Sequence, residues 1–291
     1  MRAMKWRVQA LAAVAAAAML IVPVAGAARA ASDHRRGELS TRAEVGRGVG
    51  AAPAGLRELR LPGMAPALLY VPAGYRSERP IPLVVMLHGA GGKPRHSIDL
   101  FRAHADRLGF AILAPASRGS SWDLVAARRF GADVAAIDRL LGQVFADYQV
   151  DPQRIGIAGF SDGASYALSL GLANGELFGF VLAFSPGFAA SARQQGRPRI
   201  FVSHGIQDRI LAIDRCSRRI VPELRRVGYD VNYVEFAGGH LVPAELAAEA
   251  FSMLGAAAAP TARAAPTPND VVAAADAESL SMAPAILGEG R

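Results

Sequence analysis

Residues 155–164 read I-G-I-A-G-F-S-D-G-A and contain the pentapeptide Gly159-Phe160-Ser161-Asp162-Gly163. An apolar run leads into the pentapeptide, and a segment compatible with a helix, residues 164–173, follows it. This arrangement predicts a nucleophile elbow, a tight strand-to-helix turn that exposes the serine at its tip. Glycine at both ends of the pentapeptide removes side chains that would crowd the turn. The N-terminus of the helix would direct backbone N–H groups at an oxyanion formed beside the serine.

Apolar runs alternate with helical patterns on both sides of this stretch. The runs predict strands at residues 56–61, 67–71, 81–87, 110–113, 155–158, 178–184, 199–203 and 231–236. The helical patterns cover residues 97–108, 133–148, 215–227 and 243–254. The alternation predicts an α/β fold with a mostly parallel central sheet of about eight strands and helices on both faces. The short segment between residues 184 and 199 indicates that no large lid domain covers the sheet.

Ser161, Asp208 and His240 occur in that order, each directly after a predicted strand. Ligands of such sheets gather at the carboxyl ends of the strands. Serine is a weak nucleophile at its own pKa and needs a base that a third group orients. The order therefore predicts a catalytic triad of nucleophile, acid and base, in the chain order associated with the α/β-hydrolase fold. Asp208 could instead be a turn or helix-cap residue; its nearest rival, Asp214, is better explained as a cap.

Five other histidines compete for the role of the base. They are His34 in the leader, His96 and His104 in a surface helix, and His88 and His204, each before a glycine at a strand end. The last two are predicted to support loops through hydrogen bonds. Only His240 follows both the serine and a suitable acid, on a loop rich in glycine.

The sequence L-H-G-A-G-G at residues 87–92 follows a strongly apolar run. Acyl transfer needs donors directed at the oxyanion, and a glycine-rich backbone can turn its amides toward a cleft. We expect an oxyanion hole formed by the N–H groups of Ala90 and Asp162, with Gly91 as the reserve for Ala90. The segment could instead cradle a phosphate, but it lacks the G-x-x-x-x-G-K-[ST] pattern, which makes nucleotide binding a poor explanation.

Trp122 lies in the loop 117–123 after a predicted strand. We expect it to form a wall of the substrate pocket, although packing within the loop would explain it equally well.

The two ends of the chain differ in composition from the rest. Residues 1–30 predict a secretory signal peptide, because a basic start precedes an uncharged apolar run and two small-x-small cleavage sites. A membrane anchor is the alternative, but the run of about 15 residues is shorter than the ~20 that span a bilayer. The composition predicts a flexible leader at residues 31–55 and a disordered Ala/Pro-rich tail at residues 256–291. Between them, residues 56–255 are predicted to form the α/β-hydrolase catalytic domain. The mature chain would be periplasmic or extracellular, with no stable membrane span.

Composition argues against several classes of function. The chain has 291 residues and a formal charge of +7, of which four basic residues lie in the predicted signal peptide. The other arginines are scattered, so we expect no nucleic-acid partner. Cys216 is the single cysteine, which excludes an intrachain disulfide and favours a structural thiol. No cluster of cysteine and histidine predicts a metal, and we expect no cofactor.

The motifs L-H-G-A-G-G, G-F-S-D-G, H-G-I-Q-D and G-G-H together resemble the phospholipase/carboxylesterase group of α/β hydrolases. The residues before the elbow, Y-Q-V-D-P-Q-R-I at 148–155, add to the resemblance, which spans about residues 56–254. It implies a serine esterase with Ser161, Asp208 and His240 as triad and Ala90 and Asp162 as oxyanion donors. Secreted polyester depolymerases and feruloyl esterases share this fold. The chain departs from many relatives in having aspartate, glycine and alanine after the serine, where they have glutamine and two glycines.

The sequence therefore predicts an exported serine hydrolase that cleaves a small-molecule or polymeric carboxylic ester through an acyl-serine. An acyltransferase would use the same triad, and a non-catalytic binding protein on a hydrolase scaffold is the third hypothesis. The sequence specifies neither the acyl group nor the oligomeric state.

Overall fold

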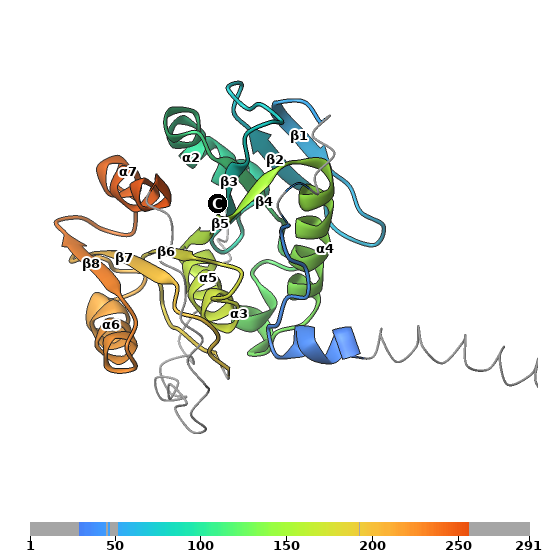
Figure 1. The fold of residues 1–291 in the computed structure, drawn as a ribbon. Coiled ribbons are helices and arrows are strands. Elements are labelled where there is room, and N and C mark those ends of the chain that lie inside the picture. Colours follow the sequence, from blue (N-terminus) through green and yellow to red (C-terminus); the bar gives the residue numbers. More distant parts are fainter. Residues whose placement is uncertain (1–28, 45, 47–51, 192, 256–291) are drawn as a thin grey trace, which may run out of the picture.

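One eight-stranded sheet runs through the centre of the protein (Figure 1). The computed structural model describes residues 29–44, 46, 52–191 and 193–255. The strands are β1 Gly55–Leu59, β2 Ala67–Val71, β3 Ile81–Leu87, β4 Ala111–Ala114, β5 Val150–Phe160, β6 Phe180–Phe184, β7 Arg199–Gly205 and β8 Val231–Phe236. They are arranged in the order β1-β2-β4-β3-β5-β6-β7-β8, antiparallel from β1 to β4 and parallel from β4 to β8. The predicted fold class is confirmed.

The position of each strand in the sheet explains its sequence. All seven residues of β3 are buried, because this strand lies between β4 and β5 and helices cover both of its faces. A strand in that position reads as a continuous apolar run. β1 lies at the edge of the sheet, and its exposed and partly buried residues alternate accordingly.

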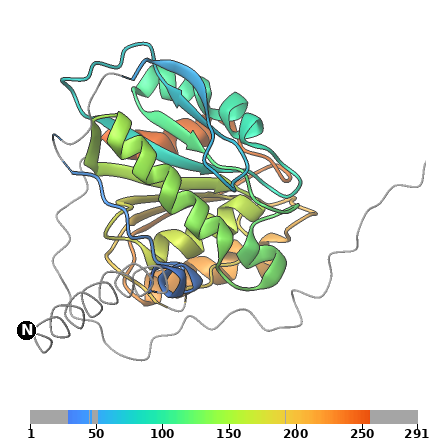
Figure 2. The ribbon, with the colours of Figure 1, turned by 90° about the vertical axis from the view of Figure 1, so that its right-hand side faces the viewer.

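Helices cover both faces of the sheet (Figures 1 and 2). They are α2 Pro94–Leu108, α3 Asp123–Ala127, α4 Ala132–Asp147, α5 Asp162–Ala173, α6 Ser217–Arg226 and α7 Ala244–Ser252, with 3₁₀ turns η1 Ile213–Arg215 and η2 Met253–Gly255. Buried residues of α2 and α7 form one core cluster on one face, whereas those of α3, α4, α5 and α6 belong to the cluster on the other face. Figure 2 shows α4 lying across the front of the sheet.

Phe251 anchors α7, the helix that follows the loop carrying His240. Its ring stacks on Phe110 at 4.9 Å between centroids and meets Phe101 of α2 edge-on at 5.3 Å. Burial of a phenylalanine side chain of this kind stabilises a fold by about 1.5–3 kcal/mol. The helix therefore holds the C-terminal end of that loop against the sheet.

The strand β5 differs from the sequence prediction, and the short helix α3 was not predicted. β5 begins at Val150, five residues before the predicted strand, because Val150 pairs with Ile81 ahead of a register shift in the β3–β5 ladder. The polar residues of this first part hid it from the apolar pattern. The helix α6 contains Pro222 in its interior and continues across it without a restart, although proline usually interrupts a helix.

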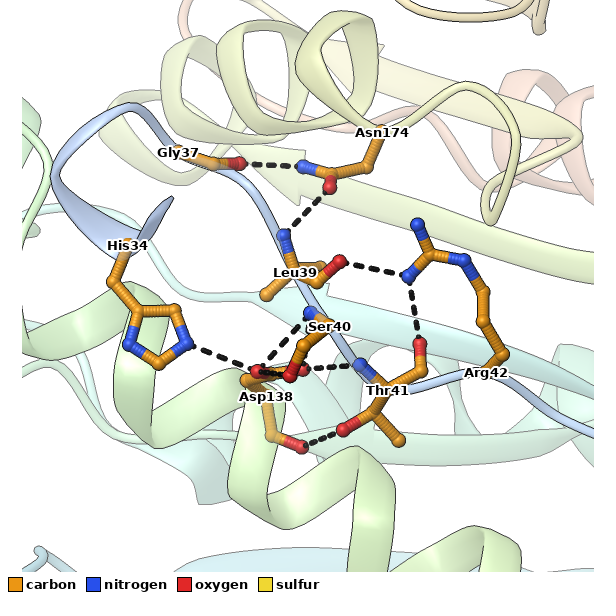
Figure 3. Close-up of polar contacts among 8 residues, drawn as sticks. All are labelled: His34, Gly37, Leu39, Ser40, Thr41, Arg42, Asp138 and Asn174. Atoms are coloured by element: carbon orange, nitrogen blue, oxygen red, sulfur yellow. Dashed lines mark hydrogen bonds and ion pairs between the residues drawn. The ribbon is translucent and has the colours of Figure 1, made fainter. Parts of the chain in front are cut away.

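Part of the predicted leader lies against the domain as a strap, here defined as residues 33–42 and drawn in blue in Figures 1 and 2. Asp138 of α4 accepts hydrogen bonds from the backbone N–H groups of Ser40 and Thr41, from the Ser40 hydroxyl, and from His34 Nε2 at 2.9 Å (Figure 3). These contacts were not expected from the sequence, because polar side chains rather than an apolar stripe make them.

A second contact joins the strap to α5, the helix that begins directly after Ser161. Asn174, next to the C-terminal end of α5, accepts a hydrogen bond from Leu39 N–H at 2.8 Å and donates one to Gly37 O at 2.6 Å (Figure 3). The side chain of Leu39 itself is buried in the core. The strap thus connects the middle of α4 with the C-terminal end of α5, two helices that pack on the same face of the sheet.

Asp138→Asn is expected to lower the free energy of unfolding at neutral pH by about 1–3 kcal/mol. The NH₂ group of asparagine would replace one carboxylate oxygen and face the N–H and O–H donors of the strap, which it cannot accept from. Burial would raise the pKa of the Asp138 carboxyl, but the hydrogen bonds from Ser40, His34 and Thr41 outweigh it and lower the pKa below 3.8. A lowered pKa stabilises the fold above the unfolded value, and this contribution is lost as the pH falls through the folded value. Urea unfolding across pH 3–7 measures both effects.

Asp99→Asn is the matched control, because Asp99 is an exposed carboxylate of α2 whose ion-pair partner, Arg95, is also exposed. Such a pair contributes at most about 1 kcal/mol. Equal losses in the two variants would contradict a special role for Asp138.

The predicted disordered tail and residues 1–28 of the predicted signal peptide lie outside the described residues. Within the described ranges, the structure contains no helix with the length and apolar character needed to cross a membrane. The described residues of the segment between β6 and β7 form no helix, in agreement with the absence of a large lid domain.

Candidate active site

Ser161 occupies a strained turn between β5 and α5. Its backbone has φ 58° and ψ −122°, in the left-handed region that costs a non-glycine residue on the order of 1–3 kcal/mol. The surroundings hold it there: Ser161 N–H donates to Phe184 O at 2.9 Å, and Ser161 O accepts from the N–H groups of Ala164 and Ser165. Strain that the neighbouring structure maintains is typical of a functional position.

The two glycines of the pentapeptide allow the close approach that this turn needs. A Cβ atom at Gly163 would lie 2.3 Å from Leu87 O and 2.6 Å from His88 O. A Cβ atom at Gly159 would lie 2.2 Å from Gly163 O. Real Cβ atoms do not come this close to backbone oxygens, so the elbow packs against the end of β3 only with glycine at these positions.

Asp208 and His240 are brought together from loops that follow neighbouring strands, β7 and β8. His240 Nδ1–H donates to Asp208 Oδ2 at 2.6 Å. The other carboxylate oxygen, Oδ1, accepts from the backbone N–H groups of Ile210 at 2.9 Å and Leu211 at 2.8 Å. Burial alone would raise the pKa of Asp208, but these hydrogen bonds outweigh it and lower the pKa. The carboxylate is therefore ionised at neutral pH and holds one edge of the imidazole.

The two loops are also joined through their backbones. Ile206 N–H donates to Phe236 O and Gln207 N–H donates to Gly238 O, both at 2.9 Å. A Cβ atom at Gly205 would lie 2.3 Å from Gly239 O, so only glycine allows this approach. The sequence did not predict this role of Gly205 in joining the two loops. Its position after His204 at the end of a strand was the signal that could have indicated it.

His240 lies beside the elbow. Its ring packs on the ring of Phe160, the residue before Ser161, with 4.6 Å between the centroids. Ser161 is largely buried, at 9% exposed, and the His240 side chain is 15% exposed. The structure thus gathers the serine, the acid and the imidazole at the carboxyl ends of β5, β7 and β8.

His204 is fully buried behind the acid. Its Nε2–H donates to Leu211 O at 2.7 Å and lies 3.3 Å from Asp208 Oδ2, while Nδ1 accepts from Ser217 Oγ at 2.7 Å. Burial lowers the pKa of His204, so the ring stays neutral. The predicted support of this loop through hydrogen bonds is confirmed.

His88 supports the loop after β3 through hydrogen bonds in a similar way. Its Nε2 accepts from Ser117 N–H at 3.1 Å, so the proton is on Nδ1, which donates to Gly89 O at 2.8 Å. Burial lowers the pKa of His88 and favours this neutral form. Loop support is confirmed here as well.

The three predicted oxyanion residues differ in their surroundings. Ala90 is exposed at the tip of the loop after β3, and Asp162 is the first residue of α5. Gly91 N–H already donates to Ser120 O at 2.6 Å. The reserve choice is therefore engaged elsewhere, which leaves Ala90 as the candidate on this loop.

Trp122 and Cys216 both lie in the interior. The indole of Trp122 is fully buried, and its Nε1–H donates to His88 O at 2.8 Å, so it packs within the loop rather than presenting a pocket wall at the surface. Burial raises the pKa of the Cys216 thiol to about 11, which suppresses the reactive thiolate. Within the described ranges, no group of three or more histidine, cysteine or acidic side chains could hold a metal ion.

The sheet order and the placement of these side chains define the class of protein: the chain has the α/β-hydrolase fold. A solved S-formylglutathione hydrolase from Staphylococcus aureus has the same fold, with a TM-score of 0.56 at 14% identity over 71% of this chain and 99% of that one. Residues 64–193 match the model of a particular family within the class, "Esterase PHB depolymerase".

Two curated relatives are also similar. A probable feruloyl esterase C from Aspergillus flavus is 30% identical over 155 residues, which span 50% of this chain and 56% of that protein. An acetylxylan esterase from Coprinopsis cinerea is 32% identical over 127 residues, or 38% of this chain and 33% of that protein. The matched region therefore spans only about half the length of the feruloyl esterase.

Proposed function

We propose that this chain is a serine hydrolase of carboxylic esters and that residues 56–255 form its catalytic unit. Ser161 is the nucleophile, His240 the general base and Asp208 the group that orients the imidazole. The amides of Ala90 and Asp162 stabilise the oxyanion.

The reaction follows the acyl-serine route. Ser161 Oγ attacks the carbonyl carbon while His240 Nε2 takes its proton, and the oxyanion forms beside the two amides. His240 then protonates the departing alkoxide and leaves an acyl-serine. Water attacks the acyl group, with the same imidazole as base, and releases the carboxylic acid and the free serine.

The main support for this proposal is that two features occur side by side. Ser161 lies in a strained turn, and the hydrogen-bonded pair of His240 Nδ1 and Asp208 Oδ2, 2.6 Å apart, lies beside that turn. Strain at a single residue or one buried ion pair would have structural explanations. A lowered pKa at Asp208 supports the role of an ionised acid that favours the protonated imidazole formed in the transition state. The match to an esterase family supports the same chemistry.

Apolar side chains beside the acid and base support an ester with an apolar or aromatic group. Ile206, Ile210 and Leu241 are 50%, 70% and 47% exposed, although large apolar residues are mostly buried elsewhere in the described chain. Ile206 and Ile210 flank Asp208, and Leu241 follows His240. The similarity to feruloyl and acetylxylan esterases makes aryl and acetyl esters of carbohydrates the first natural substrates to test.

Hydrolysis of p-nitrophenyl esters from acetate to palmitate, with methyl ferulate and acetylated xylan alongside, tests the proposal. We expect hydrolysis with a chain-length optimum, and stoichiometric labelling of Ser161 by a serine-directed phosphonate, located by peptide mass spectrometry. An enzyme that is inert on every ester and resists the phosphonate would overturn the proposal. Transfer of the acyl group to an added alcohol in preference to water would identify an acyltransferase.

We also infer that the chain is exported. The basic, apolar and small-residue regions of residues 1–30 support removal of a signal peptide during secretion. Mass spectrometry of the N-terminus of protein recovered from the periplasm or medium measures this, and an intact N-terminus in the cytoplasmic fraction would contradict it.

A further inference from the structure

The two proposed oxyanion donors come from separate parts of the chain. Ala90 lies after β3, whereas Asp162 begins α5, and 72 positions separate them in the sequence. Donors of an oxyanion hole act only when they lie about 2.7–3.1 Å from the position of the oxyanion. Something must therefore hold the two amides at a fixed separation.

Three consecutive residues, Ser120, Ser121 and Trp122, form a segment that contacts both parts. Toward the loop after β3, Ser120 O accepts from Gly91 N–H at 2.6 Å, next to Ala90. Trp122 Nε1–H donates to His88 O at 2.8 Å, and its ring packs on the His88 ring at 4.8 Å. The segment thus holds the Ala90 amide from both sides.

The same segment contacts the elbow. Ser121 Oγ–H donates to Asp162 Oδ2 at 2.5 Å, and Ser121 is 9% exposed. On its other side the Trp122 ring packs on Tyr166 of α5 at 5.2 Å between centroids, and the Tyr166 hydroxyl donates to Asp123 Oδ1 at 3.0 Å. The residue whose backbone is the second donor is therefore tied by its own side chain to the segment that holds the first.

We propose that residues 120–122 are a positioning segment for the oxyanion hole and that the Ser121–Asp162 hydrogen bond fixes the distance between its two amides. This inference rests on the proposed function, because it takes Ala90 and Asp162 as the donors. Asp162 then has two separate duties. Its N–H binds the oxyanion, and its carboxylate positions that N–H.

The hydrogen bond from Ser121 also fixes the orientation of the Asp162 carboxylate. A carboxylate beside a developing oxyanion would oppose it through repulsion between like charges. Donation from Ser121 directs one carboxylate oxygen toward the loop 117–123 instead. Loss of the Ser121 hydroxyl would therefore free the carboxylate to turn toward the oxyanion and would no longer fix the distance between the two amides.

Ser121→Ala, Asp162→Ala and the double variant test the proposal in the full chain with p-nitrophenyl butyrate. We expect each single variant to lower kcat by about 10- to 100-fold with KM changed less than about twofold, since an oxyanion hole acts on the transition state. The double variant should lose no more than the worse single variant, because both changes break one interaction. Asp162→Asn keeps a side-chain acceptor and should recover most of the kcat that Asp162→Ala loses.

Ser117→Ala is the matched control. Ser117 lies in the same loop, but its hydroxyl donates to Gly119 O within the loop, so kcat should stay within about twofold of wild type. Melting temperatures separate positioning from general loss of structure. Additive losses in the double variant, unchanged kcat in Ser121→Ala, or a fall in melting temperature without a change in kcat would overturn the inference. A wild-type enzyme without esterase activity would overturn it together with the proposed function.

Discussion

Ser161→Ala is expected to lower kcat for ester hydrolysis by about 10⁴- to 10⁶-fold, the range found when single members of a serine-protease triad are removed. The change removes the atom that would form the acyl intermediate and leaves the amides and the imidazole in place. Ser161 makes its described contacts through its backbone, which bonds Phe184, Ala164 and Ser165. Alanine should keep these contacts, so the melting temperature should stay within a few degrees of wild type.

The comparison with His240→Ala makes this result specific to the triad. Nucleophile and base act as a unit, so the Ser161→Ala/His240→Ala double variant should be no slower than Ser161→Ala alone. Rates of p-nitrophenyl butyrate hydrolysis, corrected for the buffer reaction, measure both. Multiplicative losses would indicate that the two residues act independently, and full activity of Ser161→Ala would show that another group attacks the ester.

Gly163→Ala is expected to destabilise the fold by more than about 4 kcal/mol, a large share of the roughly 5–15 kcal/mol that stabilises a typical protein. The added methyl would lie 2.3 Å from Leu87 O and 2.6 Å from His88 O, and both atoms belong to the backbone at the end of β3. Neither oxygen can move away without disturbing β3 or the following loop, which carries Ala90. Any folded fraction should therefore also lose kcat.

Gly74→Ala is the control for this substitution. A Cβ atom at Gly74 meets nothing within 4 Å, and its φ lies outside the left-handed region. The same methyl group there should change the free energy of unfolding by less than about 1 kcal/mol. Urea unfolding of both variants measures the difference, and a Gly163→Ala protein as stable as Gly74→Ala would contradict the packing at the elbow.

Local patterns carried the sequence prediction of the fold. The seven apolar residues of β3 and the three-to-four spacing in α4 are properties of neighbouring residues, and both elements formed almost where they were predicted. The first half of β5 was not predicted, because its pairing with β3 depends on a register shift rather than on an apolar pattern. The helix α6 continues across Pro222, and Val221 and Leu224 on either side of the proline are buried in the core.

The candidate triad could be named from the sequence because parallel strands bring their carboxyl ends to one edge. Strand position alone therefore placed Ser161, Asp208 and His240 at the same end of the sheet. Their catalytic roles remain predictions. The choice between Ala90 and Gly91 needed the hydrogen bond of Gly91 to Ser120, which no local pattern contains.

Long-range contacts between side chains appeared only with the tertiary structure. Ser121 meets Asp162 across 41 positions, Asn174 meets Leu39 across 135, and Trp122 turns into the core rather than toward a pocket. Periodicity shows which face of an element is apolar, because residues three or four positions apart in a helix, or two apart in a strand, lie on the same face. It carries no information on which polar groups meet once helices and loops pack, because that pairing depends on the relative positions of whole elements.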